Sequence, residues 1–148
     1  MATRHPEYYL YEDIPVIFIE PADGGLDCLA LSDTNGAFER DMQFAHKTRF
    51  GTTADIRELD RAEFIQYVEK YRAEHLRGSG PAFALYETIE ALKANARNQR
   101  RVLSDAEAAL VRTLRSESHE LFERSLREQG LTGMPDAPSN SESGSSGT

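Results

Sequence analysis

Cys28 and His46 are the two side chains whose chemistry could combine into a thiol–imidazole pair. Such a pair needs a thiolate at Cys28 and an imidazole close enough to take its proton, with Asp27, Glu39 or Asp41 orienting the ring. Cys28 lies in an apolar stretch, however, where a small buried hydrophobic residue is the ordinary interpretation. The segment also lacks a nucleophile elbow or a glycine-rich acyl motif. Cys28 and His46 are therefore catalytic candidates only, and the sequence favours a non-catalytic protein.

The remaining histidines show no metal-ligand spacing. His5, His75 and His119 form no pair within a ligand motif, and neither His-Glu-x-x-His nor Cys-x-x-Cys occurs. Residues 78–80 read Gly-Ser-Gly before a predicted helix, but the Lys-Ser/Thr that completes a phosphate-binding loop is missing. We expect no metal and no cofactor.

A basic cluster is the first candidate for partner binding. It consists of Lys93, Arg97, Arg100 and Arg101, and three of these are spaced i, i+4 and i+8. If their helix persists, these three side chains form one ridge that could meet an acidic protein surface. A solvated helix end is the plainer alternative. Nucleic acid comes third, because no interleaved aromatic residues would stack on bases.

Tyrosines near the N-terminus are the second candidate for partner binding. In a strand, Tyr9 and Tyr11 share one face while Tyr8 takes the other. Part of this aromatic surface is therefore expected to be exposed or to meet a partner, since tyrosine is common at interfaces. Coverage by the helices is the alternative.

Composition and charge restrict the class of protein. The chain has 148 residues, a net charge of −8 and a single cysteine, which excludes an internal disulfide. No apolar run approaches the roughly 18 residues of a membrane span, and the N-terminus lacks a signal-peptide core. We expect a cytoplasmic protein without a membrane partner.

Charge is divided unevenly along the chain. Residues 1–59 hold 5 basic and 11 acidic side chains, a net charge of −6, whereas residues 60–101 hold 8 basic and 6 acidic ones, a net charge of +2. An acidic surround opposes binding to phosphates. The distribution favours a protein or a small molecule over nucleic acid as the partner.

The elements that would position these residues form an α+β fold. Alternating apolar residues, a turn signal at 21–25 and Asn35-Gly36 predict a three-stranded antiparallel meander over about residues 8–44. Residues 45–58 give no clear signal. The fold class follows from strands and helices that are segregated along the chain.

Three helices are predicted, over about residues 60–76, 81–99 and 104–129. Asp60 with Glu63, and Ser104 with Glu107, have the spacing of capping boxes. The last two helices are joined by a few residues and should form a long antiparallel hairpin. Residues 131–148 are predicted to be a disordered tail, which leaves residues 1–130 as a single domain.

The leading functional interpretation is a small, non-catalytic, protein-binding factor of bacterial type. An adaptor, inhibitor, immunity-like or regulatory protein would use the acidic sheet half and the basic ridge to select its partner. The helical hairpin could also form a homodimer. The alternatives are a small-ligand protein or thiol-dependent enzyme using Cys28 and His46, and nucleic-acid binding through residues 93–101.

Overall fold

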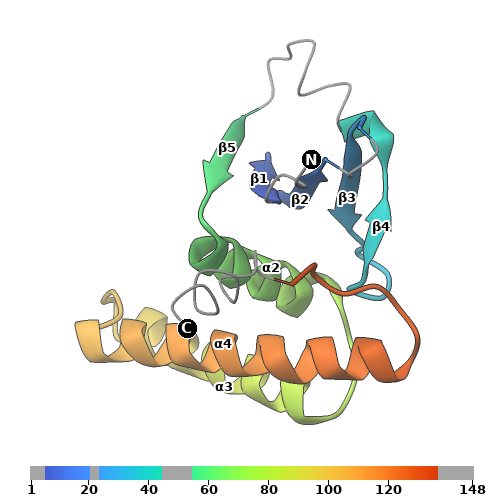
Figure 1. Cartoon of the computed structure of the whole chain (residues 1–148). Coiled ribbons are helices and arrows are strands. Elements are labelled where there is room, and N and C mark those ends of the chain that lie inside the picture. The colour runs from blue at the N-terminus through green and yellow to red at the C-terminus, as the bar shows by residue number, and fades with distance from the viewer. Residues whose placement is uncertain (1–5, 21–23, 45–54, 137–148) are drawn as a thin grey trace, which may run out of the picture.

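A sheet of five antiparallel strands precedes three helices, as Figure 1 shows, so the α+β prediction is confirmed. The computed structural model describes residues 6–20, 24–44 and 55–136. The strands are β1 (Glu7–Tyr11), β2 (Ile14–Ile19), β3 (Asp27–Leu31), β4 (Phe38–Arg40) and β5 (Ile56–Leu59).

The sheet contains two strands more than the predicted meander. Its order is β4-β3-β2-β1-β5, and every neighbouring pair is antiparallel. The aromatic stretch at the N-terminus is itself a strand, because Tyr9 pairs with Val16 on one side and with Glu58 on the other. β5 lies in the stretch that gave no sequence signal.

The last strand of the predicted meander ends early. β4 stops at Arg40, and residues 42–44 are helical instead of extended. The side chain of Asp41 accepts a hydrogen bond from the Gln43 amide at 3.1 Å, which favours a turn at this point. The predicted extension to Phe44 is therefore wrong.

All three predicted helices are present, within two residues of their expected bounds. They are α2 (Arg61–His75), α3 (Pro81–Asn98) and α4 (Asp105–Glu128). Ser104 and Glu107 form the complete capping box that starts α4. At α2 the Asp60 carboxylate accepts from the Glu63 amide at 2.8 Å.

Helix α2 is the middle of three layers. The sheet lies on one side of α2, and the α3–α4 hairpin lies on the other (Figure 1). Phe64, Val68 and Tyr71 turn toward the sheet, where they join a core with Tyr8 and Ile17. Because α2 is covered on both sides, its second face must also be buried.

Residues 131–136 return from the end of α4 across α2 (Figure 1). Met134 is only 7% exposed and belongs to the core between sheet and helix. The predicted start of the disordered tail at Leu131 is therefore too early. The rest of that prediction, from residue 137 onward, lies outside the described residues.

None of the helices described is both long and apolar enough to cross a membrane.

Candidate functional site

The end of the α3–α4 hairpin is shaped by a tight helix termination. The Arg100 amide donates to the Arg97 carbonyl at 2.9 Å, and the Arg101 amide donates to the Ala96 carbonyl at 3.0 Å. Arg100 takes a φ of 53°, the left-handed conformation that this closure requires and that normally favours glycine. The chain then turns directly into α4.

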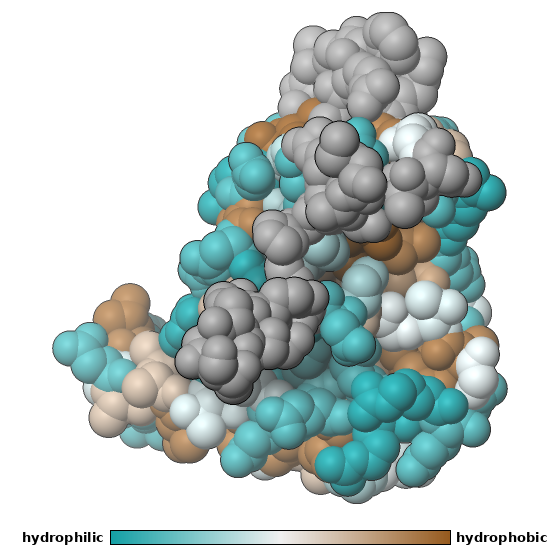
Figure 2. All heavy atoms as spheres, viewed as in Figure 1, coloured by the Kyte–Doolittle hydropathy of each residue, from teal (hydrophilic) through white to brown (hydrophobic). Residues whose placement is uncertain are grey.

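Apolar side chains are exposed at this end of the hairpin. Val102 is 86% exposed and Leu110 is 45% exposed. Figure 2 shows hydrophobic atoms on the part of the hairpin that projects beyond the sheet. We call this surface the hairpin end, and it comprises Arg97, Arg100, Arg101, Val102 and Leu110.

Two of the cations at the hairpin end are paired within the chain. The Arg101 guanidinium donates to both carboxylate oxygens of Glu107, at 2.7 and 3.0 Å. This fork, together with the Ser104 amide, lowers the pKa of Glu107 to about 2. Arg97 donates to Glu90 at 2.6 Å.

The predicted basic ridge is not continuous. α3 ends before Arg100, so Arg101 leaves the helical face that carries Lys93 and Arg97. Lys93 lies half-buried in a groove of about 410 Å³ between α2 and α3, which Arg115 of α4 also lines. Burial lowers the pKa of Lys93, and the charge of Arg115 lowers it further.

The tyrosines occupy the two faces that strand alternation predicts. Tyr8 faces α2, where its ring lies 4.9 Å from that of Phe64 and its hydroxyl accepts from Arg61 at 2.8 Å. Tyr9 and Tyr11 lie on the opposite face of the sheet. Tyr8 and Tyr11 are buried, so only the half-buried Tyr9 presents aromatic surface.

Cys28 is completely buried. Its exposed fraction is 0%, and it packs in a cluster with Val16 and Phe18 on the second face of the sheet. A thiol in this position cannot reach a substrate unless the sheet opens. The other member of the predicted pair, His46, lies outside the described residues.

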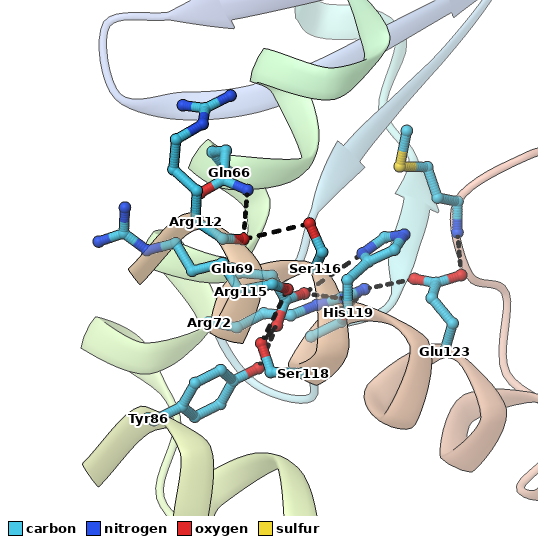
Figure 3. A network of polar contacts seen from close by, with 12 residues as sticks. Gln66, Glu69, Arg72, Tyr86, Arg112, Arg115, Ser116, Ser118, His119 and Glu123 are labelled. Carbon is cyan, nitrogen blue, oxygen red and sulfur yellow. Dashed lines mark hydrogen bonds and ion pairs between the residues drawn. The ribbon is translucent and has the colours of Figure 1, made fainter. Parts of the chain in front are cut away.

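A buried ion network links the three helices and was missed by sequence reasoning (Figure 3). At its centre the Arg72 guanidinium, which is 0% exposed, donates to Glu69 and to Glu123, each at 2.8 Å. Two further N–H groups of Arg72 donate to the Gly36 carbonyl, at 3.0 and 2.8 Å. The same guanidinium lies 4.3 Å from the centre of the Phe122 ring.

Glu69 is the second centre of this network. Its carboxylate accepts from Ser118 at 2.6 Å and from Tyr86 at 2.8 Å, and His119 Nδ1 lies 3.4 Å from it. Burial alone would raise the pKa of Glu69, but hydrogen bonds from His119 and Ser118 and the charge of Arg72 keep that pKa below its ordinary value. The network therefore holds Glu69 ionised.

The network contains a serine, a histidine and a carboxylate, as a catalytic triad does, but the hydrogen bonds connect them in a different order. Ser118 and His119 both contact Glu69, and Ser118 donates its proton to that carboxylate rather than to the imidazole. A general base must accept the proton of its nucleophile, so this geometry does not activate the hydroxyl. The arrangement joins α2, α3 and α4 and fixes the turn before β4.

Within the described part of the chain, no three His, Cys, Asp or Glu side chains gather closely enough to hold a metal ion. Comparisons with protein-family models, with curated proteins and with solved structures find no match for this chain.

Proposed function

We infer that this protein is a non-catalytic factor that binds another protein through the hairpin end. The observation that carries the inference is the exposure of two large apolar side chains of the α3–α4 hairpin, Val102 and Leu110. A contiguous exposed apolar patch marks an interaction site, and we propose that Val102 and Leu110 belong to one. An adaptor, inhibitor, immunity-like or regulatory role would use such a site.

Charge adds a preference for one kind of partner. Arg97, Arg100 and Arg101 lie close in sequence to Val102, and among the described residues Arg97 pairs with Glu90 and Arg101 with Glu107. Arginine is enriched at protein interfaces because its planar group binds carboxylates with two hydrogen bonds. We expect a partner surface that is apolar at its centre and acidic at its rim.

The acidic N-terminal part of the chain, residues 1–59, would help to select the partner rather than increase the affinity of binding. Residues 1–59 carry a net charge of −6, so a partner with the same sign of charge there would be repelled. We further propose that the protein acts in the cytoplasm.

Co-purification with a matched pair of variants tests the proposal. Val102→Asp places a charge on the hairpin end, and Met42→Asp makes the same change at an exposed residue outside the hairpin. From lysates of the source cells, the wild type and Met42→Asp should recover one protein in similar amount, and Val102→Asp should lose it. Equal recovery by all three chains would contradict the proposal.

Self-association is the alternative use of the same surface. Sedimentation of the pure protein at increasing concentration separates the two cases, because a homodimer through the hairpin needs no other component. A dimer that Val102→Asp dissociates would assign the hairpin end to a second copy of the chain.

Recovery of nucleic acid instead of protein would favour the basic residues 93–101 as a phosphate-binding site. Such binding would weaken steeply with salt, because Lys and Arg displace counterions from phosphates.

A further inference from the structure

The groove between α2 and α3 collects cations from three helices. Lys70 of α2, Lys93 of α3 and Arg115 of α4 all line it. Burial lowers the pKa of Lys93, and the charges of Arg115 and Lys70 lower it further. Three like charges that come from distant parts of the sequence therefore face one common space.

Two of these cations, Lys93 and Arg115, are half-buried and have no carboxylate partner. Among the described residues, no carboxylate oxygen lies within ion-pair distance of either side chain. None of the hydrogen bonds and ion pairs drawn in Figure 3 ends on the Arg115 guanidinium. Burial lowers the pKa of Arg115 as well. A charge that loses water without gaining a partner destabilises the fold, and an anion in the groove would compensate both charges.

The carboxylates that line the same groove are engaged elsewhere or exposed. Glu69 belongs to the buried ion network, and Glu90 accepts from Arg97 at 2.6 Å. Glu74 and Glu87 are exposed at the rim of the groove. Water and salt weaken the repulsion that such exposed charges exert on a bound anion.

The rest of the groove is partly apolar. Ala73, Phe83 and Ile89 line it together with Gly78 of the connection between α2 and α3. A Cβ added at Gly78 would lie 2.9 Å from the Phe83 ring, so this ring packs against the connection. Lys93 follows Phe83 by ten residues of α3, which is ~15 Å along the helix axis. The groove consequently has an apolar end at the connection and a cationic end at Lys93.

We propose that this groove binds a small organic anion, with its acidic group between Lys93 and Arg115 and its apolar body along Ile89 and Phe83. The planar guanidinium of Arg115 matches a carboxylate, and the ammonium of Lys93 adds a second positive charge. The volume of about 410 Å³ lies within the range that is usual for small-molecule sites. No residue of the hairpin end lines the groove, so the proposal does not depend on protein binding there.

Calorimetric titration of the full chain with octanoate tests the proposal. Octanoate carries one carboxylate on an apolar chain, 1-octanol lacks the charge, and acetate lacks the chain. The wild type should bind octanoate at least ~10-fold more tightly than either of the other two probes, because only octanoate uses both ends of the groove.

A matched pair of variants assigns the binding to the groove. Arg115→Gln removes a cation that lines the groove, whereas Arg112→Gln removes one that lies a turn earlier on α4 and pairs with Glu63 on the surface. Arg115→Gln should weaken octanoate binding at least ~10-fold, and Arg112→Gln should leave it unchanged. Lys93→Met should weaken it as Arg115→Gln does, which keeps the test decisive if one variant fails to fold.

Three results would overturn the proposal. The first is the absence of octanoate binding at millimolar concentration. The second is equal affinity of the wild type for octanoate and 1-octanol, or for octanoate and acetate. The third is equal loss of octanoate binding in Arg112→Gln and Arg115→Gln, which would place the anion on the general surface of α4.

The stability of Lys93→Met gives a readout that needs no ligand. Methionine keeps the apolar stem of the side chain and removes one of two facing charges. Since Lys93 has no partner in the fold, the urea midpoint of this variant should equal or exceed that of the wild type. A lower midpoint would show that Lys93 stabilises the fold, and it would overturn the argument that the charge awaits an anion.

Discussion

Replacing Arg72 with methionine would test whether the buried ion network holds the helical layers together. Methionine keeps much of the length of the side chain and its packing against Phe122, but it removes the charge and every N–H donor. The Glu69 and Glu123 carboxylates would then lose the cation between them, and the Gly36 carbonyl would lose both of its donors.

The expected loss is a large part of the stability of a protein of this size. Breaking a buried ion pair by removing one partner destabilises the folded state by about 3–5 kcal/mol, because the remaining charge is left without compensation. Total unfolding free energies are about 5–15 kcal/mol. Arg72→Met should therefore lower the unfolding free energy by about 3–5 kcal/mol.

Arg112→Met is the matched control. Arg112 also joins α4 to α2, through an ion pair with Glu63 at 3.0 Å, but both side chains are exposed. Exposed pairs contribute about 0.2–1 kcal/mol, so this variant should unfold close to the wild type. Urea unfolding followed by circular dichroism measures both variants.

The pH dependence of the loss in unfolding free energy gives a second test of the network. In the wild type the pKa of Glu69 lies below its ordinary value of 4.5, so the stability it contributes is present above that pH and is lost as pH falls through the lower, folded pKa. Without Arg72 this contribution is missing, and protonation relieves the unpaired carboxylates. The difference between Arg72→Met and the wild type should therefore shrink in acid. A loss under about 1 kcal/mol at neutral pH, or one that does not change with pH, would refute the reasoning.

Three further predictions concern single residues. Asp60→Ala and Ser104→Ala should each lower the unfolding free energy by about 1 kcal/mol in urea titrations, because each removes the acceptor for an N-terminal amide. Arg100→Gly should raise it by up to about 1 kcal/mol, since glycine adopts a positive φ without strain; a lower melting temperature would contradict this. Burial and the Glu69 carboxylate raise the pKa of Tyr86, so wild-type stability should fall as pH rises above the ordinary tyrosine pKa, and Tyr86→Phe should make that fall shallower.

Local signals explain why the helices could be predicted. Asp60 and Ser104 were identified as N-caps from spacing alone, and both accept the expected amide in the structure. Their effect is confined to the first turn, so no distant contact is needed to infer it. The predicted helical hairpin follows in the same way from the short connection before Ser104.

Of the two additional strands, β5 depends on distant pairing and gave little local signal. β5 has only four residues, of which Arg57 and Glu58 are exposed, so neither its length nor its pattern separates it from a loop. Its identity as a strand comes from pairing with β1, where Tyr11 meets Ile56. Such contacts join residues far apart in the sequence, and a single sequence does not report them.

The ion network was missed because its members look like surface residues. Glu69 and Arg72 are spaced i, i+3, which is also the spacing of a solvated pair on an exposed helix. A weak signal was available. Glu69 follows Val68 and Arg72 follows Tyr71, so both charged residues lie beside the apolar stripe of α2 and not on the side opposite it. What the sequence lacks is the position of the hairpin, which covers that face and makes the pair buried.

The turn between β3 and β4 has a consequence for how this sequence can change in length. Its Gly36 carbonyl is held by the fork of Arg72, and a Cβ at Gly36 would lie 2.6 Å from Phe122 and 2.8 Å from Leu76. Turns on a surface usually accept insertions, because nothing beyond the two strands fixes their size. Here the helical layer fixes it, so a library of single-residue insertions should find residues 32–37 closed to lengthening while exposed connections tolerate an extra residue.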